Sequence, residues 1–196
     1  MMLAVLLGYL AGSVPFAYLL ARRAGIDVRV AGSGNVGAAN VMRTTGTGRA
    51  IAVMSLDVAK GAAAVALAQL ASGGAALVAA TGAAAVVGHI YPVWLRFHGG
   101  KGVAVAAGVF AVLAPSATAF AVMLFVLTVW LTRYVSLGSI AATLALPPAA
   151  WLAGAPAAVV SAASGSAALI LFRHRANFRR LRAGTERRMG RQRETA

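Results

Sequence analysis

The sequence is poor in charged residues and has no cysteine. Only 11% of its 196 residues are Asp, Glu, Lys or Arg, whereas a soluble domain has about 25%. This shortage indicates that most of the surface faces lipid rather than water. The absence of cysteine excludes disulfides, thiolate nucleophiles and cysteine-ligated metal sites.

Acidic residues are scarcer still. Four Asp and Glu stand against 18 Lys and Arg, which gives a formal net charge of +14. So few carboxylates argue against a Mg²⁺ site, because Mg²⁺ needs oxygen ligands. On a soluble protein this excess of cations would suggest nucleic acid. Here the cations border apolar runs, so attraction to anionic lipid headgroups explains them and no nucleic-acid partner is expected.

Long apolar runs make up most of the chain, which is 60% hydrophobic. A helix that crosses a bilayer needs about 20 such residues. The fourth run, residues 102–114, would form a helix of roughly 20 Å, which is shorter than a hydrocarbon core of about 30 Å. Either all seven runs span the membrane, or this run and its successor form a re-entrant pair and five runs span it. The runs expected to span are residues 1–21, 50–71, 75–95, 102–114, 116–132, 137–152 and 157–172.

The charges fall in every second break between these runs. Lys and Arg occur in residues 22–49 and 96–101, at Arg133 and from Arg173 onward. The breaks near Gly73, Pro115 and Ala155 carry no charge. By the positive-inside rule the charged breaks face the cytoplasm. We therefore expect one domain over residues 1–196, an all-α integral membrane bundle of seven transmembrane helices. Its N-terminus would lie outside, and its basic tail (173–196) in the cytoplasm.

Two glycine-rich segments in charged breaks suit an anion. Between Gly32 and Thr44, closely spaced glycines let backbone N–H groups converge, and Arg43 adds a guanidinium suited to phosphate. The segment also holds Gly34, Gly37, Ser33, Asn35 and Asn40. The simpler interpretation is a flexible solvated turn. The second segment, Gly99-Gly100-Lys101-Gly102, precedes an apolar run, where a helix N-terminus and a lysine favour an anion.

Charged residues inside the runs have both structural and functional interpretations. Asp57 and Lys60 lie three residues apart in the second run, so they share a helix face. Such a pair either holds helices together or serves a site. His89, in the third run, is more simply a buried neutral histidine bonded to a backbone carbonyl.

The C-terminal charged segment contains polar residues with an unusual spacing. His174 and Asn177 lie three residues apart on one helical face, and an isolated acid, Glu186, follows. A basic amphipathic tail on anionic lipid is the simpler interpretation of this segment. Ser139, near the start of an apolar run, would on the same basis be an ordinary helix N-terminal serine.

Taken together, these segments resemble the bacterial acyl-phosphate-dependent glycerol-3-phosphate acyltransferases. The ordered set is far more specific than any one motif. Three positions depart from the family pattern: Ala39 replaces a usual Thr, Ala17 a common Gly and His98 a common Lys. The matching segments are Gly12 to Phe16, Gly32 to Thr44, Asp57 to Gly61, Gly88-His89 with Pro92, Gly99 to Gly102, Ser136-Leu137 with Ser139, His174, Asn177, and Gly184 to Glu186.

The resemblance implies transfer of an acyl group from acyl phosphate to the 1-hydroxyl of glycerol 3-phosphate, in bacterial phospholipid synthesis. The products would be lysophosphatidic acid and phosphate. It implies a multi-pass protein of the bacterial cytoplasmic (inner) membrane with its active site facing the cytoplasm. Acyl phosphate is already activated, so no metal, cofactor or enzyme nucleophile is expected. The expected partners are glycerol 3-phosphate, acyl phosphate and the lipid bilayer.

The resemblance also implies roles for individual residues. Glycerol 3-phosphate would be held by Ser33, Arg43, Lys101, His174 and Asn177, of which all but Arg43 are counted as catalytic. The acyl-phosphate head would lie on the amides of Gly34 to Gly37, with Asn40. Ser139 and Glu186 would support the site, together with Asp57, Lys60 and His89. The remaining substrate contacts would be Gly32, Asn35, Gly99, Gly100 and Gly102. The general base is either His174 or a phosphate oxygen of the substrate.

Three other functions are weaker. A small-anion transporter predicts charged groups near the bilayer midplane, whereas most charges here border the runs. A membrane phosphotransferase needs more carboxylates than four. A non-catalytic basic anchor leaves the glycine-rich segments unexplained.

Overall fold

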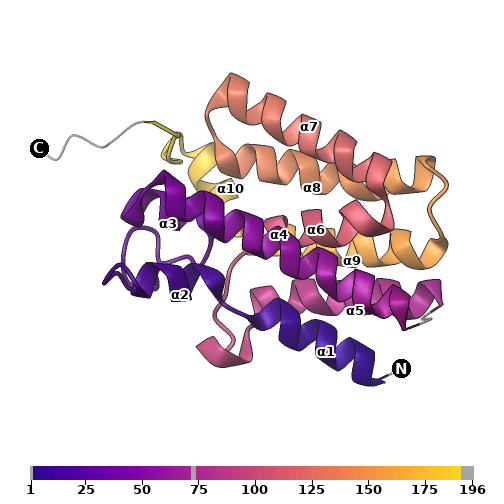
Figure 1. The fold of residues 1–196 in the computed structure, drawn as a ribbon. Helices are drawn as coiled ribbons and strands as arrows, with labels where there is room; N and C mark the ends of the chain where they lie inside the picture. Colours follow the sequence, from indigo (N-terminus) through magenta and orange to yellow (C-terminus); the bar gives the residue numbers. More distant parts are fainter. Residues whose placement is uncertain (1, 72–73, 191–196) are drawn as a thin grey trace, which may run out of the picture.

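The computed structural model describes residues 2–71 and 74–190, and the regular structure there is helical throughout (Figure 1). The predicted break at Gly73 lies outside the described residues. The helices are α1 (Met2–Ser13), α2 (Phe16–Arg22), α3 (Ala38–Thr45), α4 (Thr47–Leu70), α5 (Ala75–Ile90), the 3₁₀ turn η1 (Val93–Leu95), α6 (Val103–Leu113), α7 (Pro115–Thr132), α8 (Val135–Leu152), α9 (Ala157–Arg173) and α10 (Arg175–Arg182).

Five segments of the described chain are long and apolar enough to cross a membrane. They are Met2–Arg22, Thr47–Leu70, Ala75–Leu95, Pro115–Thr132 and Val135–Leu152. The bent pair α9 and α10, which meet at 55°, raises the number to six. α6 is apolar but has only 11 residues, in line with the short fourth run. The chain is therefore an all-helical multi-pass membrane protein.

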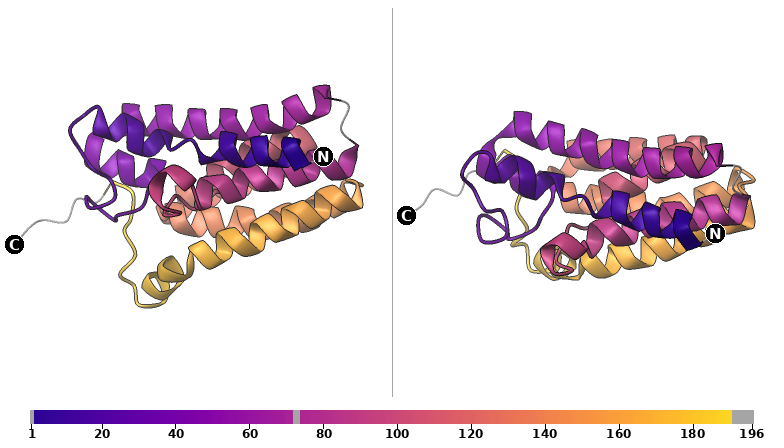
Figure 2. Two further views of the ribbon diagram at one scale, coloured as in Figure 1. Left: turned by 90° about the horizontal axis from the view of Figure 1, so that it is seen from below. Right: turned by 60° about the horizontal axis from the view of Figure 1, so that its bottom comes forward.

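Glycines let the transmembrane helices approach closely. A Cβ atom at Gly12 of α1 would overlap the backbone of α5, and one at Gly88 of α5 would overlap α1. Gly61 of α4 and Gly108 of α6 face the partner backbone in the same way. Lipid supplies no hydrophobic drive between helices, so small residues that permit backbone contact provide much of the packing. Figure 2 shows α1 running along α5.

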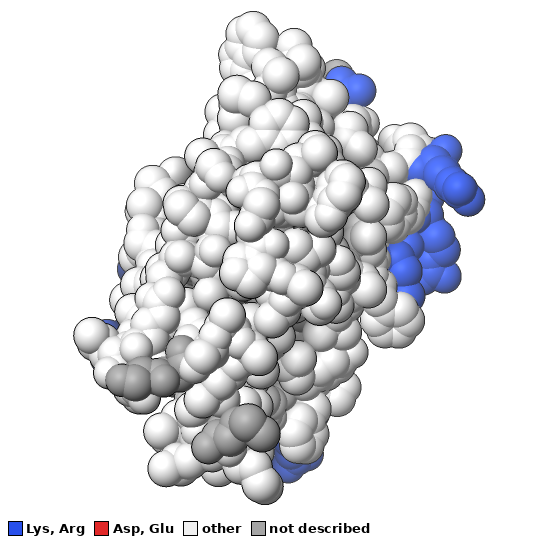
Figure 3. All heavy atoms as spheres, turned by 90° about the vertical axis from the view of Figure 1, so that its right-hand side faces the viewer, with Lys and Arg blue, Asp and Glu red and all other residues white. Residues whose placement is uncertain are grey.

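The charged and uncharged breaks lie at opposite ends of the bundle. α2, α3 and α10 gather at one end, on the left of Figure 1, and the N-terminal end of α1 lies at the other. Figure 3 views the molecule from that second end: the surface is almost entirely free of charge, with Lys and Arg only near its margin. The loops carrying the predicted site residues therefore share one end of the molecule.

Candidate active site

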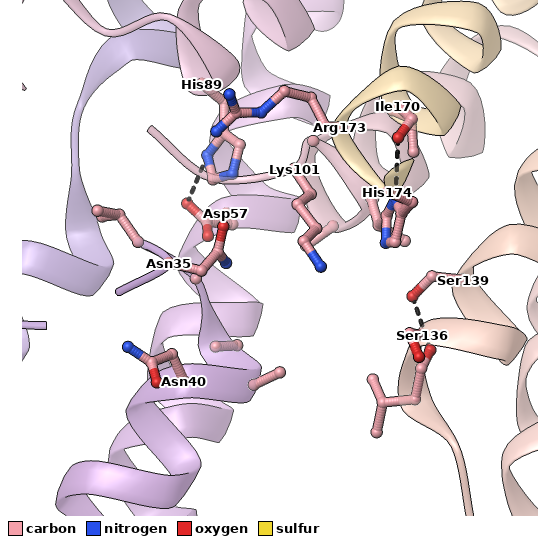
Figure 4. A pocket seen from close by; sticks show the side chains of 18 of the residues that line it. Asn35, Asn40, Asp57, His89, Lys101, Ser136, Ser139, Ile170, Arg173 and His174 are labelled. Atoms are coloured by element: carbon pink, nitrogen blue, oxygen red, sulfur yellow. Dashed lines mark hydrogen bonds and ion pairs between the residues drawn. The ribbon is translucent and has the colours of Figure 1, made fainter. Parts of the chain in front are cut away.

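A large cavity of about 1520 Å³ opens at the charged end of the bundle. Arg43 of α3, Lys101 of the loop before α6, and Asn177 of α10 all line it. The three cation-bearing stretches thus fold around a single space (Figure 4). Of the predicted site residues, only Gly100 and Lys60 lie outside this lining. The rest line it: Gly32, Ser33, Gly34, Asn35, Gly37, Asn40, Asp57, His89, Gly99, Gly102, Ser139, His174 and Glu186, besides the three already named.

Asn40 shapes the first glycine loop. Its side chain is fully buried, and its Oδ1 accepts a hydrogen bond from the Ser33 amide at 2.8 Å. Its Nδ2 donates to the carbonyls of Val28 and Ala31, both at 3.0 Å. Through these three hydrogen bonds, the Asn40 side chain of α3 fixes the preceding loop at Val28, Ala31 and Ser33. The Asn40 side chain therefore positions the loop, while Asn40 also lines the cavity.

Fewer loop amides point at the cavity than the glycine spacing predicted. Gly34 donates its N–H to Ala31 O at 3.1 Å, and Gly37 donates to Asn35 O at 3.1 Å. These donors turn the chain and are not available to an anion. α3 begins at Ala38, and the first N–H groups of a helix have no partner within it. The N-terminus of α3 therefore offers further N–H groups beside this loop.

The second glycine loop is hydrogen-bonded to the end of α5. Gly99 donates its N–H to Ile90 O at 3.1 Å, and Gly100 donates to His89 O at 3.2 Å. These two donors satisfy carbonyls at the C-terminal end of α5 and are therefore not available to an anion. Gly102 follows with a left-handed φ of 92° and starts α6. Its helix N-terminus and Lys101 remain the anion-binding features of this loop.

Lys101 connects to the C-terminal segment through a buried polar network. Its Nζ donates to Asn177 Oδ1. Asn177 Nδ2 in turn donates to Glu186 Oε1 at 2.7 Å, and Ser136 Oγ donates to the same oxygen at 3.0 Å. Arg180 Nε donates to Glu186 Oε2 at 2.7 Å. One carboxylate in the segment after α10 thus fixes groups from α8 and α10.

The electrostatics of this network suit an anionic ligand. Burial lowers the pKa of Lys101 to about 8; Glu186 raises it, and Arg180, Arg43 and Arg173 lower it further. Burial raises the pKa of the Glu186 carboxyl, but hydrogen bonds from Arg180, Asn177 and Ser136 outweigh it and lower that pKa below its usual value. The cations that line the cavity therefore outnumber its two lining carboxylates, Asp57 and Glu186.

His174 and Ser139 lie on the wall opposite the first glycine loop (Figure 4). The His174 ring is only 2% exposed, and its Nδ1 pairs with Ile170 O at 2.8 Å. Because a carbonyl only accepts, Nδ1 carries the proton and Nε2 is left to accept one. Ser139 donates its hydroxyl to Val135 O of its own helix at 2.9 Å. His174 is thus placed to orient a substrate hydroxyl.

Asp57, Lys60 and His89 form a second polar cluster. Asp57 and His89 line the cavity, and Lys60 lies outside its lining. Lys60 Nζ lies 2.8 Å from Asp57 Oδ1 and 3.1 Å from His89 Nδ1, and it donates to Val14 O at 2.7 Å. His89 thus pairs with a lysine side chain rather than with the backbone carbonyl of the simpler interpretation. The cluster joins α4, α5 and the break between α1 and α2.

Part of the cavity lining is apolar. It includes Val122 and Phe125 of α7, Ala142 and Leu146 of α8 and Ala107 of α6. Val122 is 45% exposed, so this side of the cavity opens toward the lipid-facing surface. A ligand with a charged head and an apolar chain matches this division.

Sequence reasoning gave no role to three residues of the site, although it named Ser136 in a matching segment. Arg180 and Ser136 hold Glu186, and Arg173 donates through Nη2 to Gly99 O at 3.2 Å. A signal existed for Arg180, since it follows Asn177 by three residues on the same helical face. Nothing local marks Arg173 among the nine arginines of the tail.

Comparison with known proteins supports a specific assignment for this arrangement. The family model described as "Glycerol-3-phosphate acyltransferase" matches residues 2–184. A protein of that name from Rubrobacter xylanophilus is 46% identical over 188 residues, covering 96% of this chain and 94% of its own. One from Myxococcus xanthus is 48% identical over 189 residues, covering 94% and 97%.

Solved structures agree. The glycerol 3-phosphate form of PlsY (YgiH), an integral membrane glycerol 3-phosphate acyltransferase, superposes with a TM-score of 0.92 at 41% identity, covering 96% of this chain and 95% of the other. The lysophosphatidic acid form of PlsY gives a TM-score of 0.90 at 40% identity, with the same coverage. The chain belongs to the glycerol-3-phosphate acyltransferase family.

Proposed function

We propose that this protein transfers an acyl group from acyl phosphate to the 1-hydroxyl of glycerol 3-phosphate, producing lysophosphatidic acid and inorganic phosphate in membrane phospholipid synthesis. One observation carries the proposal: Arg43, Lys101 and the α10 residues surround one polar chamber that continues into an apolar, lipid-side groove. Such a space accommodates two phosphates and one acyl chain. The two PlsY forms, named for glycerol 3-phosphate and lysophosphatidic acid, support the same reaction.

The chemistry fits the residues present. The 1-hydroxyl oxygen attacks the carbonyl carbon of the mixed anhydride, and the bond from that carbon to the phosphate oxygen breaks. Phosphate leaves with the bonding electrons. The hydroxyl proton is taken by His174 Nε2 or by an oxygen of the departing phosphate. Positioning the two substrates alone is worth about 7–11 kcal/mol, so cations and helix N-termini suffice without an enzyme nucleophile.

We propose the following roles for the residues that line the cavity. Lys101, Arg43, Ser33 and Asn177 would hold the glycerol phosphate, and His174 would orient its hydroxyl. The N-termini of α3 and α6 would receive the phosphate of the acyl donor. The acyl chain would lie between α6, α7 and α8.

We also propose seven membrane crossings, with α6 as the short one, the N-terminus outside and the site facing the cytoplasm of a bacterial inner membrane. Two features support this topology: the charged loops share one end, and the beginning of α1 lies at the other. The positive-inside rule then assigns the charged end to the cytoplasm.

The direct test is purified protein in detergent with synthetic acyl phosphate and radiolabelled glycerol 3-phosphate. We expect labelled lysophosphatidic acid and stoichiometric phosphate. Parallel reactions with acyl-CoA or acyl carrier protein as donor should give no product. Folded protein that makes no lysophosphatidic acid from acyl phosphate would overturn the proposal, and equal use of acyl-CoA would overturn the donor assignment.

A further inference from the structure

The loop before Lys101 has almost no room to move. Besides the two amide bonds to α5, a Cβ atom at Gly100 would overlap the His89 ring and the Val36 carbonyl. Gly99 is closed in similarly by His89 O and the Pro92 ring. The ring of His89 therefore packs directly on the loop backbone, at the point where the first glycine loop also meets it.

Lys60 contacts the same ring through its Nδ1 atom. Its ammonium lies against Asp57, Val14 O and His89 Nδ1 at 2.7–3.1 Å. An ammonium has only donors, so His89 Nδ1 accepts and the ring proton is on Nε2, the atom next to Gly100. The Lys60 side chain is 6% exposed and the Asp57 side chain 3%. A buried ion pair thus sets the tautomer and the orientation of the ring.

Arg173 holds the loop from the other side. Its Nη2 donates to Gly99 O at 3.2 Å, and its guanidinium lies 5.8 Å from the centre of the Tyr91 ring. Its Nε is buried without a hydrogen-bond partner among the described residues. Figure 4 shows the guanidinium beside His89, above the base of Lys101.

We infer that Arg173 and the Asp57–Lys60–His89 cluster are positioning residues that clamp the Gly99–Gly100 backbone from two sides and so fix Lys101 and the N-terminus of α6. We call these four residues the loop clamp. Lys101 and α6 are the groups that meet the substrate phosphates, so this inference rests on the proposed function. It adds that the His89 ring and the Arg173 guanidinium, which are not substrate contacts in this inference, determine the position of Lys101 and thereby the rate of the reaction.

The first test compares two charge-neutral substitutions of His89. His89→Leu removes the acceptor of the Lys60 ammonium, whereas His89→Asn keeps an acceptor at the position of Nδ1. A misplacement of about 1 Å can cost about 100-fold in rate, so we expect kcat/KM to fall by about that factor in His89→Leu. His89→Asn should recover most of it. Thr81→Val, which removes another buried polar group of α5, is the control and should retain activity.

The second test uses two arginines on either side of the bend between α9 and α10. Arg173→Met removes the donor to Gly99 O, and Arg175→Met removes a neighbouring guanidinium that lies on the exposed Phe172 ring. We expect a large loss of kcat/KM in the first variant and little change in the second. If His89→Leu does not fold, this pair carries the test, because Arg173 lies partly exposed at the end of α9.

A third measurement does not depend on activity. The chain has only two lysines, Lys60 and Lys101, so modification of Lys101 by an amine reagent can be followed by peptide mass spectrometry. A loosened loop should expose Lys101, so His89→Leu should label several times faster than wild type and His89→Asn at the wild-type rate. These two variants leave the local charge unchanged, so the comparison reports position rather than electrostatics.

The outcomes separate the two proposals. A wild-type protein without acyltransferase activity overturns the proposed function, while the labelling rates still test the clamp. An active wild type with unaltered kinetics in His89→Leu and Arg173→Met overturns the clamp. So does lost activity with unchanged labelling in His89→Leu, since that result would mean that His89 touches substrate directly.

Discussion

Two buried carboxylates organise this protein in different ways. Asp57 lies within α4, and its partner Lys60 is one turn further along the same helix, so the pair is local. Glu186 follows α10 and receives hydrogen bonds from Ser136, Asn177 and Arg180, of which the first belongs to a helix 50 residues earlier. Asp57 is held inside a transmembrane helix, whereas Glu186 is held in the segment that closes the charged end of the cavity.

The difference separates stability from substrate binding. Asp57 neutralises a lysine of α4 that also contacts α5 and the break between α1 and α2, so it belongs to the framework of the bundle. Glu186 reaches Lys101 through Asn177, so it orients groups that meet the substrate. Variants of the Asp57 pair should therefore lower the unfolding temperature as well as disturb the loop that carries Lys101, whereas variants of Glu186 should act on turnover alone.

The largest effect should come from breaking the framework pair. Asp57→Asn preserves the shape but leaves the Lys60 ammonium buried without its counter-ion, which costs about 3–5 kcal/mol. We expect a large fall in the unfolding temperature in detergent. The double variant Asp57→Asn/Lys60→Met removes both charges and should regain most of the stability. A double variant no more stable than the single one would show that the pair is not the source of the loss.

Removing a cation from the cavity should act on turnover instead. Lys101→Ala and Arg43→Ala each delete a group that faces developing or transferred phosphate charge, and losses of about 10²–10³-fold in kcat are typical for such groups. The unfolding temperature should change little. Arg179→Ala, an exposed arginine of α10, is the matched control. Equal losses in all three variants would indicate that general surface charge, not the cavity, drives the reaction.

A smaller effect is expected when Glu186 loses only its charge. Glu186→Gln keeps an oxygen for Asn177 and Ser136 but weakens the pair with Arg180, whose side chain is 43% exposed. We expect kcat/KM to fall by about tenfold, in line with one charge-assisted hydrogen bond of about 1.5–3 kcal/mol replaced by a weaker one. Glu186→Ala, which removes all three contacts, should lose clearly more. The ranking of the two variants is the decisive observation.

This comparison also explains what could be predicted from the sequence. The Asp57–Lys60 pair was predictable because a spacing of three residues is a property of any helix. Five of the seven expected membrane-spanning runs, the short α6 and the gathering of the charged loops followed from hydropathy and charge alone. The direction of the Gly99 and Gly100 amides did not, because it depends on where the end of α5 lies. Arg173 and the partners of Glu186 likewise required the tertiary structure.

The smallest expected effect is a pH dependence that isolates Lys101. Burial lowers the pKa of its ammonium to about 8 in the unliganded protein, with Glu186 opposing and Arg180, Arg43 and Arg173 adding to that shift. As pH rises through this value the lysine loses its proton and its attraction for phosphate, so kcat/KM for glycerol 3-phosphate, which reports the free enzyme, should fall on the alkaline side. The limiting slope is tenfold per pH unit for a single group. Lys101→Arg keeps its charge at every accessible pH, so whatever activity it retains should show no decline between about pH 8 and 10. An unchanged alkaline limb in that variant would assign the titration to another group and separate Lys101 from the pH response.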